Sequence, residues 1–391
     1  MAQKLKIAFV IQRCGKEIVG GAESLCLNVS SKISQYFDIE ILTTCALDYM
    51  TWQNHYPEGI EKINQVIIRR FKTDSTRDVA KFNQLSDKVL VGSHSLDEEQ
   101  EWMKLQGPYS SNLLNFIKNN QDDYVLFVFF TYLYATTYYG LPLVSTKSIL
   151  VPLAHDELPL KLSIYKNTFE SAKGIIFHTE EEQDLVLSKF NVKDKKSRLI
   201  GYGVDDLTDI SSNFSFRHDL NYDYLLYVGR IDESKGCGEL IDFFLRYVNE
   251  NNSRLKLVLV GPKIFEFSAS DNIVYLGVLD EEAKSYVIKK SLIFVMPSRY
   301  ESFSIATMEA WLAKKPVLVN AKSEVLKGHC EKSNGGLYYE TYDEFAACIN
   351  LLVSSTDMQK QLGDNGYNYV KQNYGWNNVI NNYRDFFSKF Q

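Results

Sequence analysis

Two glutamates follow one apolar stretch in the second half of the chain. Residues 297–310 come directly after the apolar residues 292–296 and carry Glu301 and Glu309, eight positions apart. If a helix begins near Ser304, Glu301 lies on the loop before it, and Glu309 lies about 7.5 Å along the axis from the helix start, at about 1.5 Å per residue. The two carboxylates are then too far apart to act as one close acid pair.

The same segment could hold an anion between the two acids. The backbone N–H groups of residues 303–306 would point out of the helix N-terminus, where the helix dipole also favours negative charge. Because helical side chains lean toward the helix N-terminus, Glu309 would point back toward a neighbouring group such as a ribose diol. A diphosphate with hydroxyl-bearing groups on both sides fits this pattern. Two solvated acids on a surface helix are the alternative, which the pair alone leaves open.

A second cluster supplies cations. Another apolar stretch ends at Gly229, and Arg230 and Lys235 then lie five residues apart on a glycine-bounded loop. In a doubly wound sheet this loop and the glutamate loop open at the same sheet edge, where the two cations could bind diphosphate oxygens. The alternative is a charged surface loop in which Arg230 pairs with Asp232 or Glu233. Taken alone, the cluster favours that alternative.

Two weaker features lie in the first half. Gly20 and Gly21 stand at the expected turn into the first helix, where missing side chains permit close approach of a ligand, although a plain helix-start turn is the alternative. His155 follows the apolar residues 149–153, at the expected carboxyl end of a strand; a lone histidine there is more often structural. The motifs G-x-G-x-x-G, G-x-S-x-G, H-E-x-x-H and G-x-x-x-x-G-K-[ST] do not occur, which disfavours nicotinamide enzymes, serine hydrolases, zincins and P-loop NTPases.

Alternating strand and helix patterns must position these residues. Short apolar stretches of strand length recur in both halves, with room for crossover helices between them. The predicted strands are 6–11, 39–43, 66–70, 124–129, 149–153 and 174–177, then 224–228, 255–260, 273–276, 292–296 and 316–319. The polar residues 203–218 between the two sets are typical of an interdomain linker. The pattern predicts an α/β protein with two Rossmann-like, doubly wound parallel-sheet domains that face each other across a cleft.

Composition narrows the classes of function. The 391 residues are 45% hydrophobic and 24% charged, as in a globular protein, and the net charge of −6 gives no global positive field for nucleic acid. Six dispersed cysteines without a C-x-x-C pair favour reduced thiols, and the N-terminus shows no export signal, so we expect a cytoplasmic protein. Residues 124–146 carry no charge, but their pattern favours a buried strand and a short helix over a membrane span.

In combination these motifs resemble a known family. Gly229 and Arg230 with Lys235, the Glu-x7-Glu spacing, the glycine pair and the chain length are similar to the retaining family 4 glycosyltransferases of GT-B fold. The resemblance covers nearly the whole chain. It implies that Arg230 and Lys235 neutralise the donor diphosphate. It also implies that Glu301 grips the hydroxyls of the donor sugar and that Glu309 binds the ribose.

The resemblance implies further contacts. Its catalytic group would also include His155, near the anomeric carbon of the donor sugar. Donor-binding positions would be Gly20, Gly21, Gly229, Gly261, Pro262, Val278, Leu279, Ser302, Phe303, Ser304, Ile305 and Glu309. Among these, Ser304 departs from the family, which often has Gly or Pro there. As a helix N-cap its hydroxyl would compete for the helix amides.

The implied activity is a metal-independent hexosyl transfer with retention of configuration, without a cofactor. The donor is a nucleotide-diphosphate sugar and the acceptor a saccharide or lipid-linked saccharide in surface polysaccharide biosynthesis. Residues 1–205 and 376–391 would form the acceptor domain and residues 206–375 the donor domain. We expect no nucleic-acid partner and at most peripheral association with the inner face of the membrane. A sugar-nucleotide 2-epimerase of similar form and a non-catalytic nucleotide-sugar binding protein are the alternatives.

Overall fold

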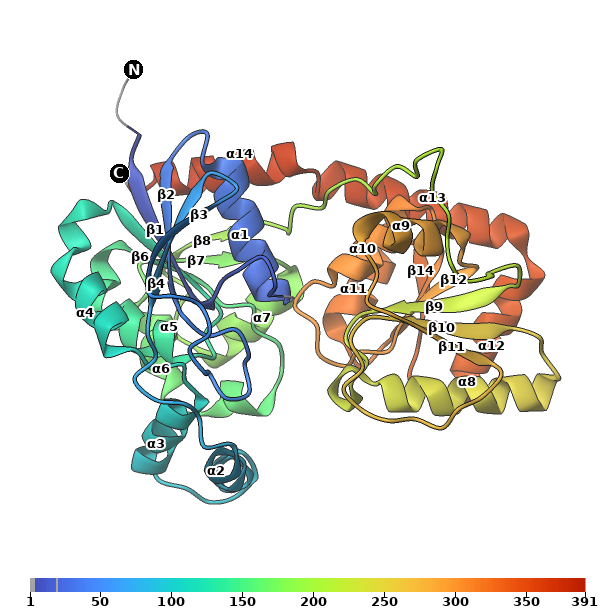
Figure 1. Ribbon diagram of the computed structural model, residues 1–391, viewed down its shortest axis with the longest axis horizontal. Helices are drawn as coiled ribbons and strands as arrows, with labels where there is room; N and C mark the ends of the chain where they lie inside the picture. The colour runs from blue at the N-terminus through green and yellow to red at the C-terminus, as the bar shows by residue number, and fades with distance from the viewer. Residues whose placement is uncertain (1–3, 19, 391) are drawn as a thin grey trace. The chain divides into compact units, whose positions relative to one another are not determined.

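The computed structural model describes residues 4–18 and 20–390, and it contains two compact α/β units. Unit 1 comprises Met1–Gly201 with Asn377–Gln391, and unit 2 comprises Tyr202–Trp376 (Figure 1). Each unit has one sheet with helices packed on it. The prediction of an α/β protein with two parallel-sheet domains is confirmed.

Unit 1 is built on a sheet of eight strands in the order β3-β4-β2-β1-β5-β6-β7-β8. Its neighbouring strands are parallel except for β3, which runs antiparallel to β4. The bounds are β1 (Lys6–Arg13), β2 (Asp38–Thr44), β3 (Gly59–Ile63), β4 (Val66–Phe71), β5 (Leu126–Phe130), β6 (Ser148–Val151), β7 (Gly174–Phe177) and β8 (Lys196–Leu199). The central strands are almost wholly buried, because helices cover both faces of the sheet.

The helices of unit 1 include the last helix of the chain. They are α1 (Gly21–Ile33), α2 (Val79–Val91), α3 (Leu96–Gln106), α4 (Ser111–Asn119), α5 (Ala135–Gly140), α6 (Tyr165–Ser171), α7 (Glu180–Lys189) and α14 (Trp376–Ser388), with the short 3-10 helices η1 (Gln121–Asp123), η2 (Leu141–Lys147) and η3 (Leu158–Lys161). The apolar face of α14 is buried, and the ring of Phe387 lies 6.4 Å from that of Phe9 and 5.7 Å from that of Phe37. This packing attaches the C-terminal helix to the first unit.

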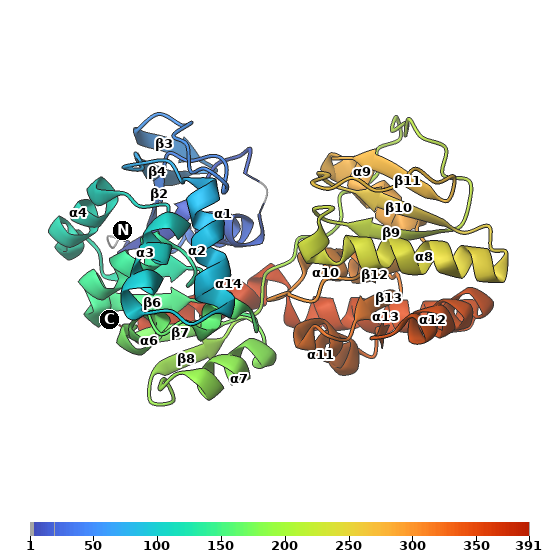
Figure 2. The same cartoon turned by 90° about the horizontal axis from the view of Figure 1, so that it is seen from below.

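Unit 2 has a six-stranded, all-parallel sheet in the order β11-β10-β9-β12-β13-β14. Its strands are β9 (Tyr224–Val228), β10 (Lys256–Val260), β11 (Ile273–Gly277), β12 (Ile293–Met296), β13 (Val317–Asn320) and β14 (Gly336–Tyr339). Its helices are η4 (Glu233–Lys235), α8 (Cys237–Asn251), α9 (Glu281–Lys290), α10 (Ile305–Leu312), α11 (Glu324–Ser333), α12 (Tyr342–Ser354) and α13 (Thr356–Asn373). Helices α8 and α12 lie on one face of the sheet and α9 and α10 on the other (Figures 1 and 2).

The strand order of unit 2 reverses at β9. The chain runs from β9 outward to β10 and β11, and then returns to β12 on the other side of β9. Open α/β sheets bind ligands outside the carboxyl ends of their strands at such a reversal. The two loops that sequence analysis singled out follow β9 and β12, so both begin at this point.

Three strands were not predicted, and all three are at or next to a sheet edge. Four of the five residues of β3 are exposed, and so are most residues of β8. Neither strand therefore shows an apolar stretch or a clear alternation of apolar and polar residues in the sequence. The short β14 begins with glycine. The antiparallel β3 is an edge strand on the otherwise parallel sheet of unit 1. The uncharged residues 124–146 form β5, α5 and most of η2, and within the described residues no helix is long and apolar enough to cross a membrane.

Candidate functional site

The candidate site lies at the carboxyl ends of β9 and β12. These two strands are paired, and the loops that follow them carry Lys235 and Glu301. The Nζ atom of Lys235 lies 2.8 Å from Oε1 of Glu301, and their side chains are 31% and 15% exposed. Two residues that are 66 positions apart in the chain are therefore in contact in a partly shielded place. In such a place a charge pair can also bind a charged or hydroxyl-bearing ligand.

Glycines bring the site loops close together. A Cβ atom at Gly236 would lie 2.6 Å from the carbonyl oxygen of Pro297, the first residue after β12, and Gly236 itself has a φ of +73°. A Cβ atom at Gly261 would lie 2.0 Å from the carbonyl oxygen of Gly229. Any larger residue at Gly236 or Gly261 would push the loops apart, because no L side chain fits at these distances.

Arg230 is already paired within its own loop. Its Nε atom lies 2.8 Å from Oδ2 of Asp232, which is the alternative pairing that the sequence left open. Burial opposes ionisation of Asp232, but the backbone amide of Ser234 and the Arg230 guanidinium outweigh it and hold the pKa of this carboxyl below its usual range. Arg230 is thus a charged group next to the Lys235 turn, with an acidic partner of its own.

Glu309 is not a solvated acid. It lies on α10, and its Oε1 atom accepts a hydrogen bond of 2.8 Å from Nζ of Lys284 on α9, with only 16% of the glutamate side chain exposed. Burial raises the pKa of Glu309, although the Lys284 charge opposes this effect. Sequence reasoning missed Lys284, because no motif marks it and only the packing of α9 against α10 brings it near.

The start of α10 differs from the expectation for Ser304. This residue has a φ of +68°, and its hydroxyl lies 2.9 Å from Oγ1 of Thr307 instead of bonding to a helix amide. The expected competition of Ser304 for the helix amides was therefore wrong, because its hydroxyl pairs with that of Thr307. Among the described residues of this turn, Ser304 leaves the amides at the start of α10, from Ile305 onward, without a side-chain cap.

An aromatic cluster supports the loop before α10. Phe303 is buried and stacks on Tyr202, with ring centroids 5.5 Å apart. Its ring also meets His329 edge-on at 5.3 Å and Tyr374 at 4.8 Å. Ser302 beside it is half-buried. The Phe303 side chain thus serves as an anchor, and any contact of this residue with a ligand would come from its backbone.

The remaining predicted donor contacts lie along the same sheet edge. The amide of Gly229 donates to the carbonyl of Val260, and the amide of Gly261 donates to the carbonyl of Gly277, so backbone hydrogen bonds join the loops after β9, β10 and β11. Pro262 accepts a hydrogen bond from the amide of Ile231. Beyond this edge Val278 is exposed and Leu279 half-buried.

The other predicted residues belong to unit 1. Gly20 is the N-cap of α1, and a Cβ atom there would lie 2.2 Å from Oε2 of Glu23, whereas Gly21 has open space at that position. Glu23 is buried and accepts hydrogen bonds from Nε of Arg13 at 2.6 Å and Nε2 of Gln12 at 3.1 Å. The close approach at Gly20 is therefore to the protein's own carboxylate, which sequence reasoning missed.

His155 follows β6 and lies beside a second missed acid. Its Nε2 atom is 3.3 Å from Oε2 of Glu157, and Oε1 of Glu157 accepts a hydrogen bond of 2.6 Å from the hydroxyl of Tyr132. The glutamate is thus held by the phenol and faces the imidazole. The only sequence signal was an acid two residues after the histidine.

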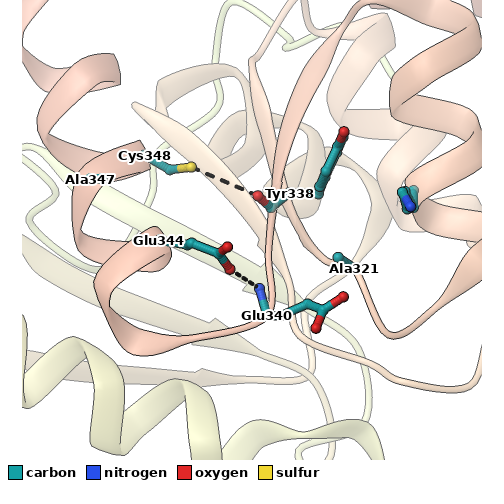
Figure 3. A pocket seen from close by; sticks show the side chains of 7 residues that line it. Ala321, Tyr338, Glu340, Glu344, Ala347 and Cys348 are labelled. Carbon is teal, nitrogen blue, oxygen red and sulfur yellow. Dashed lines mark hydrogen bonds between the residues drawn. The ribbon is translucent and has the colours of Figure 1, made fainter.

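Among the described residues no metal-binding cluster occurs, and the cavity described below is lined by residues outside the candidate site. Across residues 4–18 and 20–390 there is no group of three His, Cys, Asp or Glu side chains placed to hold a metal ion, and the six cysteines are free. A cavity of about 250 Å³ beside β14 and α12 is lined by Ala321, Lys327, Tyr338, Glu340, Glu344, Ala347 and Cys348 (Figure 3). Burial raises the pKa of its Cys348 thiol to about 11, so this cysteine is not a nucleophile at neutral pH.

Comparison by sequence finds a family model that matches part of the second half of the chain. Residues 210–369 match the family model described as glycosyl transferases group 1. An uncharacterized glycosyltransferase of Methanocaldococcus jannaschii is 23% identical over 233 residues, which are 55% of this chain and 59% of the relative. The chain thus spans about three fifths of the length of this curated relative.

Comparison of structures covers both units. The sucrose-phosphate synthase of Thermosynechococcus elongatus matches with a TM-score of 0.73 at 16% identity, over 99% of this chain and 100% of that one. HepE of Anabaena, solved in complex with UDP and glucose, matches with a TM-score of 0.69 at 16% identity, over 98% of this chain and 100% of that one. These matches establish the GT-B fold of the chain.

Proposed function

We propose that the chain is a glycosyltransferase, because residues 210–369 match the glycosyl transferases group 1 model and the chain has the GT-B fold. It transfers a sugar from a nucleotide-diphosphate sugar to a saccharide or lipid-linked saccharide acceptor. The observation that carries this proposal is the contact between Lys235 and Glu301 at the reversal point of the sheet in unit 2. A cation and an acid at this edge fit a ligand that carries both phosphate and hydroxyl groups.

The chemistry needs stabilisation of a leaving group. When the bond between the anomeric carbon and the diphosphate oxygen breaks, the sugar becomes oxocarbenium-like and negative charge grows on the diphosphate. Lys235, Arg230 and the uncapped amides of α10 supply positive charge and hydrogen-bond donors at one sheet edge. The acceptor hydroxyl forms the new bond to the anomeric carbon, and its proton passes to the leaving phosphate.

The other predicted roles extend this proposal. Glu301 binds hydroxyls of the donor sugar, and Glu309, held by Lys284, binds the ribose. His155 in unit 1 contacts the sugar near the reacting carbon, with Glu157 beside it. HepE was solved with UDP and glucose, which supports a UDP-sugar as the first donor to test. We place the enzyme in surface polysaccharide biosynthesis, in the cytoplasm or at the inner face of the membrane.

A donor panel tests the proposal. UDP-glucose, UDP-N-acetylglucosamine, GDP-mannose and ADP-glucose at 1 mM are compared by thermal unfolding, and we expect one of them to raise the Tm by several degrees, as a ligand at about 100 times its Kd does. The same donor is then incubated with the enzyme alone and with saccharide acceptors. Conversion of the donor sugar without acceptor would indicate an epimerase, and stabilisation without turnover under any acceptor would indicate a binding protein. No shift with any donor would contradict the proposal.

Two further features of the reaction are expected. We propose that transfer proceeds at the front face with retention of the anomeric configuration, because the sequence supplies no compelling nucleophile for a double displacement. We also expect turnover to persist in 5 mM EDTA, since Arg230 and Lys235 can neutralise the diphosphate in place of a divalent ion. Proton NMR of the first product reports the configuration of the new linkage. The amount of product formed with and without EDTA reports whether turnover needs a metal ion. An inverted linkage would refute the first, and loss of turnover that Mg²⁺ restores would refute the second.

A further inference from the structure

One fully buried amide connects the loop of Glu301 to the rest of unit 2. Asn320, the last residue of β13, is 0% exposed. Its Nδ2 atom donates to the carbonyl oxygen of Pro297 at 3.1 Å and to Oε1 of Glu239 at 3.1 Å, and its Oδ1 atom accepts from the amide of Lys322 at 3.0 Å. Burying an amide is costly unless it is hydrogen-bonded, and here both polar ends of the side chain are used.

The carbonyl of Pro297 is a shared contact point. Pro297 begins the loop that leads to Glu301, and its oxygen lies where a Cβ atom of Gly236 would come within 2.6 Å. Gly236 directly follows Lys235. The backbone of the lysine loop therefore packs against the same peptide group that Asn320 holds by a hydrogen bond, so this amide fixes the base of one loop against the other.

Glu239 adds a second attachment. Its Oε1 atom takes the hydrogen bond from Asn320, and its Oε2 atom lies 2.6 Å from Nη2 of Arg299, two residues before Glu301. The loop is thus held at Pro297 from inside the sheet and at Arg299 from the first turn of α8. The bond from Asn320 to Pro297 is shielded from water. The Arg299 side chain is 44% exposed, so its ion pair with Glu239 stabilises the loop less.

We infer that Asn320 is a positioning residue that places Glu301 for recognition of the donor sugar. This inference rests on the proposed function, in which Glu301 contacts the sugar while Lys235 and Arg230 contact the diphosphate. Without the bond to Pro297, the Glu301 loop loses its inner attachment. The loop after β9 loses only its packing partner and keeps its own bonds: Arg230 still pairs with Asp232, and the amides of Lys235 and Gly236 still donate within the loop. Loss of Asn320 therefore weakens binding of the sugar more than binding of the diphosphate.

The test compares two ligands on one variant. Asn320→Ala is titrated calorimetrically with the nucleotide sugar that stabilises the wild type most in the donor panel and with its parent nucleoside diphosphate. We expect the Kd of the nucleotide sugar to rise about tenfold or more and the Kd of the nucleoside diphosphate to change less than threefold. Asn320→Ser, whose hydroxyl can donate to only one acceptor, should show a smaller shift in the same direction and serves if the alanine variant does not fold.

Two controls separate positioning from general destabilisation. Tyr247→Phe removes a 2.8 Å hydrogen bond from α8 to Asn350, at a residue that is 3% exposed, and should leave the ratio of the two Kd values unchanged. Arg299→Met removes only the exposed attachment and should alter the ratio less than twofold. If Asn320→Ala raises the Kd of both ligands by the same factor, or changes neither Kd, the positioning role of Asn320 is overturned. A wild type that binds no nucleotide sugar would instead overturn the proposed function.

Discussion

Lys235→Ala is expected to lower kcat/KM by about 30-fold to several thousand-fold, which corresponds to about 2 to 5 kcal/mol of transition-state stabilisation. The Lys235 side chain is two-thirds buried and lies against Glu301. Under the proposed mechanism its removal takes away a cation from the leaving diphosphate, and it also leaves the Glu301 carboxylate without that partner. Both effects raise the barrier. Steady-state kinetics at saturating and limiting donor, with the donor and acceptor found in the panel, measure the loss.

The matched control is a cation in an exposed pair of the same unit. Arg246 on α8 pairs with Glu250 at 2.8 Å, with about half of each side chain exposed. Such pairs contribute little to stability, so Arg246→Ala should stay within about twofold of the wild type. Retention of activity within about threefold in Lys235→Ala, at both donor concentrations, would contradict the role of Lys235.

Acid is expected to destabilise the protein through two buried histidines. Burial lowers the pKa of His178 in unit 1 to about 4 and that of His329 in unit 2 to about 3. In the unfolded chain both have a pKa near 6.5, so between that value and the folded pKa the unfolded state binds more protons and stability falls as pH falls. At pH 5 each histidine should cost about 2 kcal/mol of unfolding free energy relative to pH 7.5.

The measurement compares acid slopes between variants. Burial also raises the pKa of Glu182 to about 7 and raises that of Glu309, and both effects work in the opposite direction, so the wild-type slope alone is not decisive. Urea unfolding at pH 7.5 and pH 5 should show that His329→Gln loses about 2 kcal/mol less than the wild type over this interval. Identical slopes for His329→Gln and the wild type would rule this explanation out.

The sequence pattern predicted strands best where all side chains of a strand are buried. The strands that carry the site, β9 and β12, are nearly continuous apolar stretches that end at Gly229 and Pro297, and this signal is local. The edge strands β3 and β8 lacked such a signal because water reaches most of their side chains. The same reasoning placed the cations and acids at one sheet edge, since parallel strands end together.

Side-chain partners could not be predicted from spacing. The pairing of Glu309 with Lys284 depends on how α9 packs against α10, and that of Glu239 with Asn320 depends on the approach of α8 to β13. The backbone at Ser304 was also beyond prediction, because a serine with positive φ is rare and its cause lies in the surrounding loop. Contacts between distant segments decide these features.

The aromatic cluster around Phe303 determines where the chain can be cut to produce unit 2 as a separate fragment. The stretch that matches the family model ends at residue 369 and begins at 210, so it contains neither Tyr202 nor Tyr374. Both of these rings pack on Phe303 from the two ends of unit 2. A fragment cut at the family boundaries would remove both of these rings from Phe303 and keep only its contact with His329 among the three. An excised unit 2 must therefore keep both flanking tyrosines.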